Sequence, residues 1–198
     1  MPVVSELARA DASPSIAAMY DRIFGKGRDP VAEPGTATGT PGNWWTIWAR
    51  TPALLGFFNQ YSYLDAPLDP MLRGLVLART GYVRESRFVY SQHCKGARGA
   101  GIAEDKIAGI PAWTMHDVYT QRERAALALT DALAGDDGRL HDDVFAALQQ
   151  HFSNEELLTL LYFINLYILH ATTCRALRLE YDDIDERITE VPRPESAA

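Results

Sequence analysis

The chain has 198 residues, of which 47% are hydrophobic and 23% are charged, a balance typical of a globular protein. Its net charge of -7 at neutral pH argues against nucleic acid as a partner, because surfaces that bind polyanions are basic. No apolar run reaches the roughly 18 residues that a membrane span requires, and the N-terminus lacks a basic region followed by an apolar one. We therefore expect a cytoplasmic protein without a membrane partner.

The first helix signal is Ser13-Pro14, a capping serine followed by proline at the first helical position, and Gly25 is expected to end this helix. Residues 25–42 are rich in glycine and proline and predict a long loop, which is either a lid or an arm exchanged between subunits. Three tryptophans, among them Trp45, then enter a helix that Thr51-Pro52 interrupts and restarts. The tryptophans either pack in the core or in an interface, or they form the wall of a substrate pocket.

The rest of the chain contains further helix signals. They predict helices over residues 70–81, 84–101, 103–111, 120–133 and 154–179, two of them with capping boxes at Thr120 and Ser153. Gly81 is expected to stop the first of these helices, and the last one should be central because it is apolar nearly all round. No stretch alternates as a strand would, so we predict a single all-α domain of seven or eight helices. An acidic run at residues 180–186 is either solvated or a clamp on a neighbouring subunit.

The helix predicted over residues 84–101 carries the first candidate site. Its face around His93 includes Tyr90, Ser86 and small residues, whereas a helix that only packs would place larger aliphatic side chains there. We expect this face to line a pocket in which His93 acts as an acid or base, since imidazole titrates near neutral pH. The alternative is a core histidine whose hydrogen bonds are satisfied.

The last predicted helix carries a second polar stripe, formed by Tyr167, His170 and Cys174. If the two helices pack together, His93 and His170 can converge into a general acid/base couple. We expect no metal site, because the chain lacks a compact ligand spacing. We also expect no nucleotide cofactor, because no glycine motif that cradles phosphate is present.

The roles of the two cysteines and of Glu85 are ambiguous. Cys94 points about 100° away from His93, so the imidazole cannot activate the thiol as a base on the same face would. Cys94 and Cys174 lack the Cys-x-x-Cys spacing of redox motifs and are either buried structural thiols or a pair that meets in space. Glu85 shares a side of the predicted helix with Gln92 and is either a proton carrier or a first-turn acid.

Several segments between Trp48 and Asp183 form an ordered set. They are residues 72–77, 97–101, 123–127, 145–148, 153–157 and 167–179, together with the motif Phe88-Val89-Tyr90-Ser91-Gln92-His93. With this set the chain resembles the carboxymuconolactone decarboxylase family, within the alkylhydroperoxidase D-like superfamily. The resemblance implies a six-helix core, self-association into trimers or hexamers, and an active site near the histidine that His93 matches. We divide the chain accordingly into an N-terminal helix and arm (1–42), a helical domain (43–183) and a flexible tail (184–198).

The chain departs from the family pattern at three positions. The peroxidase branch has a glutamate in the helix before the motif and a Cys-x-x-Cys ahead of the histidine, and Gly74, Ser86 and Val89 stand at these places here. The machinery of a thiol peroxidase is therefore missing. The decarboxylase branch also commonly has a glutamate where Gly74 stands.

The residues and the resemblance together predict a cofactor-independent lyase or isomerase that acts on a small organic acid or lactone, as in the catabolism of aromatic compounds. The expected catalytic residues are His93, Tyr90 and Glu85. The expected substrate-binding residues are Ser86, Gln92, Cys94, Arg73, Trp45, Tyr167 and His170. An arginine, which can be Arg73, Arg79 or Arg84, would suit a substrate carboxylate. The alternatives are a redox protein that uses Cys94 and a non-catalytic helical oligomer that binds a ligand.

Overall fold

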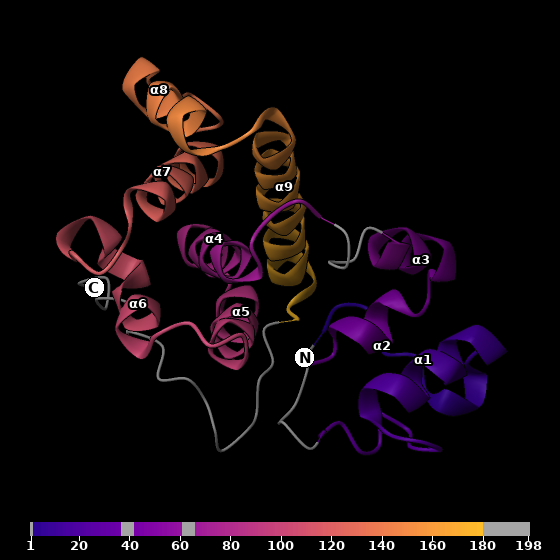
Figure 1. Cartoon of the computed structure of the whole chain (residues 1–198). Coiled ribbons are helices and arrows are strands. Elements are labelled where there is room, and N and C mark those ends of the chain that lie inside the picture. The colour runs from indigo at the N-terminus through magenta and orange to yellow at the C-terminus, as the bar shows by residue number, and fades with distance from the viewer. Residues whose placement is uncertain (1, 37–41, 61–65, 180–198) are drawn as a thin grey trace, which may run out of the picture. The chain divides into compact units, whose positions relative to one another are not determined.

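A computed structural model describes residues 2–36, 42–60 and 66–179, without the side chains of residues 57–60 (Figure 1). Within these ranges the regular structure consists of nine α-helices and two short 3-10 helices, without a strand, which confirms the all-α prediction. Part of the predicted loop over residues 25–42, the acidic run and the predicted tail lie outside the described residues.

The described residues form two compact units. The first comprises the residues up to 60 and residues 174–179, with helices η1 (Arg9–Asp11), α1 (Pro14–Phe24), α2 (Trp44–Trp48) and α3 (Pro52–Gln60). The second comprises residues 66–173, with helices α4 (Pro70–Val83), α5 (Arg87–Gly99), α6 (Glu104–Gly109), η2 (Ile110–Met115), α7 (Gln121–Gly135), α8 (Asp142–His151) and most of α9 (Asn154–Leu177). The predicted domains end at residues 42 and 183, whereas the boundaries between the two units lie after residues 65 and 173. The predicted domain division stays a prediction.

Helix α1 begins and ends where its sequence predicts. The Ser13 hydroxyl accepts the backbone N–H of Ile16 at 3.4 Å, and Pro14 lies in the first turn. Gly25 ends the helix with a φ of 108°, a conformation that glycine adopts more readily than other residues. The apolar face of α1 buries Ile16, Met19, Tyr20 and Phe24, and Ile23 is half-buried.

The first residues of the chain are tied to helix α2. The Thr46 hydroxyl donates to Glu6 at 2.7 Å, and the Arg50 guanidinium donates to the Ser5 hydroxyl at 2.7 Å. Two further hydrogen bonds join the Val3 N–H to the Leu177 carbonyl at 3.0 Å and the Tyr20 hydroxyl to the Leu7 carbonyl at 2.8 Å. The segment before α1 is thus held by polar contacts along its length.

Helix α2 gathers the tryptophans into one cluster. Trp44 is buried and meets the half-buried Trp45 edge to face, with ring centroids 4.7 Å apart. The ring centroids of Trp48 and Trp44 are 6.1 Å apart. Helix α3 begins at Pro52, where the sequence predicts that the interrupted helix restarts. Trp44 therefore contributes to the core of the first unit.

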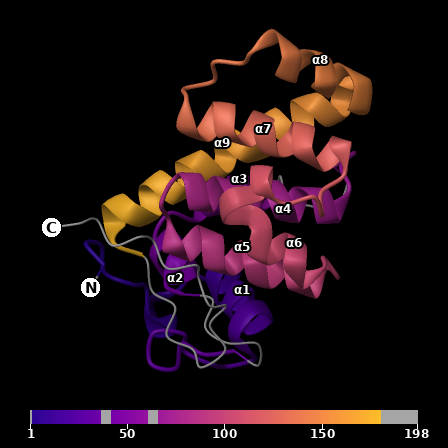
Figure 2. The same cartoon turned by 90° about the vertical axis from the view of Figure 1, so that its left-hand side faces the viewer.

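Helices α8, α7, α4 and α5 follow one another across the second unit, as Figures 1 and 2 show. Helix α9 contacts three of them in turn, through Arg122 of α7 with Glu156, Arg73 of α4 with Phe163, and His93 of α5 with Tyr167. These contacts confirm that the last helix is central. A buried core between α4, α5, α6 and α7 includes Leu75, Ala78, Tyr90, Cys94, Ala97, Ile107 and Leu127.

Helix α9 is the one described helix that is long and apolar enough to cross a membrane by length and composition. This signal is weak, because the core helix of a soluble protein meets the same criterion. Leu160, Phe163 and Ile164 of α9 are buried inside the protein. The absence of a membrane partner stays a prediction.

The connection between α4 and α5 corrects two predictions. Helix α4 does not stop at Gly81 but continues to Val83, and Gly81 instead lets α5 approach, since a Cβ there would lie 2.5 Å from the backbone nitrogen of Tyr90. Helix α5 begins at Arg87 rather than at residue 84, with Ser86 as its cap. Glu85 lies between the two helices with a φ of 55°, and the N–H of Ser86 reaches back to the Gly81 carbonyl at 2.9 Å. This is the Schellman arrangement that usually carries glycine where Glu85 stands.

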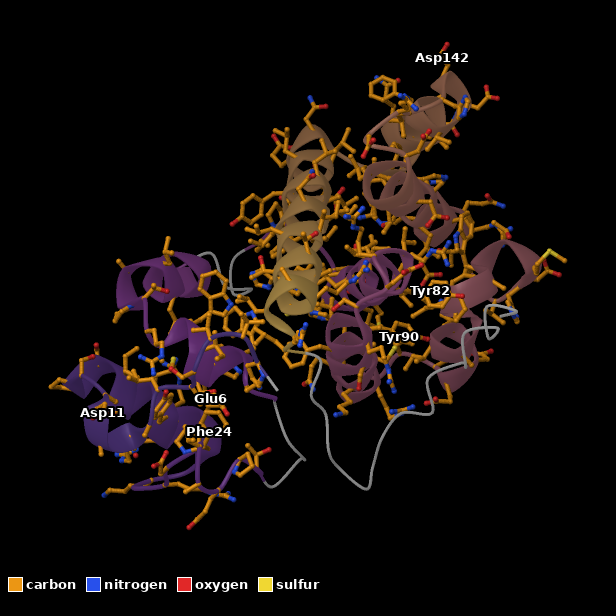
Figure 3. All side chains as sticks on the ribbon, turned by 180° about the vertical axis from the view of Figure 1, so that it is seen from behind. Glu6, Asp11, Phe24, Tyr82, Tyr90 and Asp142 are labelled. Carbon is orange, nitrogen blue, oxygen red and sulfur yellow. The ribbon has the colours of Figure 1, made fainter. Side chains whose placement is uncertain are left out.

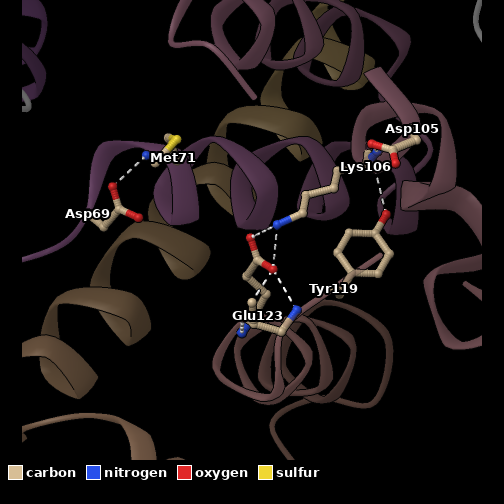
Figure 4. A network of polar contacts seen from close by, with 7 residues as sticks. Asp69, Met71, Asp105, Lys106, Tyr119 and Glu123 are labelled. Atoms are coloured by element: carbon tan, nitrogen blue, oxygen red, sulfur yellow. Dashed lines mark hydrogen bonds and ion pairs between the residues drawn. The ribbon is translucent and has the colours of Figure 1, made fainter. Parts of the chain in front are cut away.

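Polar contacts join α6 and α7 (Figure 4). The Lys106 ammonium donates to both oxygens of Glu123, at 2.6 and 2.8 Å, and the Tyr119 hydroxyl donates to the Lys106 carbonyl at 2.6 Å. Glu123 also closes the predicted capping box with Thr120. The second predicted capping box, between Ser153 and Glu156, is formed as well.

Candidate functional site

His93 on α5 and His170 on α9 converge on one tyrosine. The rings of His93 and Tyr167 lie edge to face with centroids 4.4 Å apart, and the Tyr167 and His170 centroids are 4.9 Å apart. Tyr167 and His170 share a face of α9 because three residues make almost one helical turn. The predicted convergence of the two polar helices is therefore present, with the tyrosine ring in contact with both imidazoles.

Both imidazoles are biased toward the neutral form. Burial lowers the pKa of His170 to about 4. Burial, followed by the positive charges of His170 and Arg73, lowers the pKa of His93 to about 3. Protein atoms surround the His93 ring although its side chain keeps some solvent contact, whereas His170 is 9% exposed. At neutral pH each ring can therefore accept a proton and donate one hydrogen bond.

Arg73 supplies positive charge beside this cluster. Its guanidinium carbon lies 5.7 Å from the centre of the Phe163 ring, which belongs to α9 one turn before Tyr167. The aromatic face steers a long, flexible side chain toward the helix that carries both site residues. Phe163 was not among the predicted site residues, because in the sequence it is one of many apolar residues on α9.

Gly74 follows Arg73 and lines the contact between α4 and α5. A Cβ at this place would lie 3.2 Å from the Ile102 side chain and 3.4 Å from the Cβ of Ala97. The glutamate that the resemblance implies at this place would crowd this contact unless Ile102 moved. Close packing between α4 and α5 therefore takes the place of the carboxylate.

Tyr90 and Cys94 lie in the buried core of the second unit. Tyr90 packs against Tyr82 of α4, with ring centroids 5.7 Å apart (Figure 3), and both Tyr90 and Cys94 belong to the core between α4, α5, α6 and α7. Cys94 has no exposed surface. The sequence placed Tyr90 on the same helix face as His93. In the structure Tyr90 packs against Tyr82 of α4, whereas His93 packs against Tyr167 of α9.

The remaining predicted residues occupy several environments. Ser86 is buried and caps α5, its hydroxyl accepting the Val89 N–H at 3.4 Å. Glu85 is exposed and outside the helix, so it does not share a helical side with the half-buried Gln92. Trp45 belongs to the first unit, and its role as a pocket wall stays a prediction.

The structure also locates the two cysteines and the side chains that could bind a metal. Cys94 and Cys174 are both buried thiols and belong to different compact units. In the part of the chain that the structure describes, no group of three histidine, cysteine, aspartate or glutamate side chains could hold a metal ion. The arrangement at His93 is suited to moving a proton next to a positive charge.

Known proteins share this fold. Residues 52–132 match the profile of the carboxymuconolactone decarboxylase family. YdfG, an uncharacterised protein of Bacillus subtilis strain 168, is 28% identical over 102 residues, which cover 51% of this chain and 69% of YdfG. An uncharacterised peroxidase-related protein of Ralstonia eutropha JMP134 with an alkylhydroperoxidase AhpD core aligns with a TM-score of 0.72 at 14% identity, over 92% of both chains. A cysteine-to-alanine variant of the debrominase Bmp8, bound to 2,3,4-tribromopyrrole, aligns with a TM-score of 0.67 at 15% identity, over 90% of this chain and 91% of its own.

Proposed function

We propose that this chain, whose residues 52–132 match the profile of the carboxymuconolactone decarboxylase family and whose fold is that of AhpD-like proteins, is a cofactor-independent lyase or isomerase of a small organic acid or lactone. The superfamily includes enzymes, among them a debrominase. The observation that carries the proposal is the convergence of His93 and His170 on Tyr167. Two bases and a phenol in contact form a set that can take a proton from carbon and return it.

His93 is the proposed acid/base. In a double-bond or lactone rearrangement its neutral ring would remove a proton next to the substrate carbonyl and return it to another carbon, while donors nearby stabilise the enolate. We assign this donor role to Tyr167 and His170, since a phenol and a neutral imidazole each carry one hydrogen to donate. Arg73 would attract a substrate carboxylate.

The other predicted residues have weaker support. Tyr90 faces the core of the second unit, and Glu85 is exposed at a helix junction. Ser86 acts as a helix cap, and Gln92 lies next to His93 in the chain. We place the acid/base role on His93, with Tyr167 and His170 beside it, and give Tyr90 and Glu85 no step.

Redox chemistry through Cys94 is the second candidate, because the fold is shared with a peroxidase-related protein. The burial of Cys94 argues against it, since a thiol must be reached by its oxidant to react. Binding of a ligand near His93 without turnover is the third candidate.

Assays of purified variants separate these candidates. We would measure turnover of carboxylated lactones, β-keto acids and organic hydroperoxides with His93→Gln, Tyr167→Phe and Cys94→Ser, and with the exposed His141→Gln as a matched control. The proposal expects His93→Gln to lower kcat/KM for a lactone or keto acid by about 100-fold or more, with His141→Gln unchanged. Hydroperoxide turnover that disappears in Cys94→Ser alone would establish the redox alternative. No turnover of any panel member, with tight binding of one, would favour a binding protein.

Assembly and location complete the proposal. We propose trimers or hexamers, as the resemblance implies, and a mass measurement in solution that finds only monomers would contradict this. We also propose a cytoplasmic location, since Cys94 and Cys174 are thiols rather than a disulfide and thiols suit a reducing compartment. A role in the catabolism of aromatic compounds stays part of the proposal.

A further inference from the structure

Arg122, in the first turn of α7, joins the end of α8 to the beginning of α9. Its guanidinium donates to the backbone carbonyl of His151, the last residue of α8, and to the Glu156 carboxylate in the first turn of α9 at 2.7 Å. The guanidinium carbon lies 4.2 Å from the centre of the Phe152 ring. Guanidinium N–H groups donate in the plane of the group, so two such bonds and a neighbouring ring hold it in one orientation.

Glu156 carries this constraint into α9. One carboxylate oxygen accepts from Arg122, and the other accepts the backbone N–H of Ser153 at 3.0 Å. The Ser153 hydroxyl accepts the Glu156 N–H at 3.2 Å, so the carboxylate that binds Arg122 also belongs to the capping box that starts α9. Positions 156, 163 and 167 are spaced by two turns and by one turn, so Phe163 and Tyr167 share the face of α9 that Glu156 presents to α7.

The contact between α9 and α5 at the candidate site closes a ring of four helices. Helices α5 and α4 meet at Gly81, where a Cβ would lie only 2.5 Å from the backbone of α5. Arg79 of α4 donates to both carboxylate oxygens of Asp131 of α7, at 2.6 and 3.0 Å. Arg122 then joins α7 to α9. The two site rings meet on the fourth side of this ring, so the distance between them depends on the other three contacts.

We propose that Arg122 is a positioning residue of the candidate site, which sets the axial position of α9 and thereby the contact of Tyr167 with His93. For its effect on turnover the inference rests on the proposed function, whereas its effect on the ring contact is independent of any reaction. Glu156 and Tyr167 are about 16 Å apart along the helix axis, at 1.5 Å per residue. Ring pairs of this kind tolerate sliding, since their centroid distances range over about 4.5–7 Å. A displacement at the beginning of α9 is therefore passed along the helix to the site.

A small displacement is sufficient to affect catalysis. Tyr167 and His170 both lie on α9, so they move together relative to His93 on α5. Misplacement of a catalytic group by about 1 Å, caused by a change far from the reacting atoms, can lower a rate by about 100-fold.

Nuclear magnetic resonance of the His93 ring tests the inference without a substrate. The Tyr167 ring contacts this imidazole, and its ring current displaces the carbon-bound proton resonances by an amount that falls steeply with distance. His93→Gln identifies these resonances by their loss, and Tyr167→Leu gives their positions without the neighbouring aromatic ring. We expect Arg122→Met to move them part of the way toward the Tyr167→Leu positions.

Three further variants distinguish positioning from a general loss of stability. Lys106→Met is the matched control, because it removes another partly buried ion pair, with Glu123, that does not hold α9. It should lower stability in urea and leave the His93 resonances in place. Glu156→Gln removes the charge from the Arg122 pair and should displace the resonances in the same direction as Arg122→Met, and it decides the test if Arg122→Met does not fold. Arg122→Lys should restore only part of the wild-type positions, since an ammonium lacks the planar fork.

The inference is overturned if Glu156→Gln and a folded Arg122→Met both keep the wild-type His93 resonances, or if Lys106→Met displaces them equally. Turnover separates this result from the proposed function. With a lactone or keto acid that is converted, Arg122→Met should lower kcat by about 10- to 100-fold, and Lys106→Met should not. Displaced resonances without any wild-type turnover would support the inference and contradict the proposed function. Turnover that depends on His93, with unchanged resonances, would do the reverse.

Discussion

The backbone nitrogen of Tyr90 lies 2.5 Å from the place where a side chain on Gly81 would begin. Real Cβ atoms do not come this close to a backbone atom, so the contact between α4 and α5 requires glycine here. Because α5 also carries His93, the same contact fixes how far the site helix lies from the helix that carries Arg73.

Gly81→Ala should therefore destabilise the protein. The added methyl must push α5 away from α4, and overpacking of this kind costs about 1–3 kcal/mol or more. Gly96→Ala is the matched control, because Gly96 lies within α5 with open space around it, and there alanine should stabilise by about 0.5–1 kcal/mol. Urea unfolding of both variants measures the two effects, and equal stability of the two would contradict this account of Gly81.

Glu85→Gly should stabilise the protein by about 1 kcal/mol. Glu85 has a φ of 55°, which strains a residue with a side chain but suits glycine. Glu85→Ala removes the same carboxylate without relieving the backbone, so it should be less stable than Glu85→Gly. If both variants keep lactone turnover, Glu85 has no catalytic role, whereas an equal loss in both would return it to the site.

Stability should fall with acid because of His93 and His170. Both have a pKa below the usual 6.5 in the folded chain, so the unfolded chain binds more protons between about pH 4 and 6.5. The free energy of unfolding should then decrease as the pH falls from 7 to 5, by up to about 1.4 kcal/mol per pH unit for each histidine. His170→Phe should weaken this dependence and His141→Gln should not, as urea titrations at each pH would show.

Cys94 and Cys174 should resist thiol reagents in the folded protein. Neither has exposed surface, so labelling requires an opening of the structure. A maleimide or disulfide reagent should modify both thiols rapidly in about 6 M urea and slowly in buffer, with the slow rate following the stability of each variant. Rapid labelling of Cys94 in buffer would reopen the redox alternative.

Local signals were predictable from the sequence. The caps at Ser13, Thr120 and Ser153 are confirmed because a cap depends on residues within one helical turn. The end of α5 near Gly101 is also confirmed, since its φ of 87° is a local requirement. The convergence of His93 with His170 could be anticipated because each histidine lies on a polar stripe of its helix, and the two stripes can face each other.

Non-local relationships were not predictable in the same way. Gly81 was read as a helix stop because its sequence neighbours do not reveal that Tyr90 approaches it. Periodicity placed Tyr90 beside His93 on one face but could not say that different helices contact the two side chains. Arg73 on the Phe163 ring joins residues far apart in the chain, and only packing shows it.

The hydrogen bonds that hold the first residues have a practical meaning for handling the protein. Ser5, Glu6 and Leu7 lie near the beginning of the chain, where proteases commonly cut, yet each accepts a hydrogen bond from Arg50, Thr46 or Tyr20. If a purification tag is cleaved off at a site inside this segment, these hydrogen-bond acceptors are removed together with the tag. The removal site is better placed ahead of residue 2, so that Thr46 and Tyr20 keep their partners.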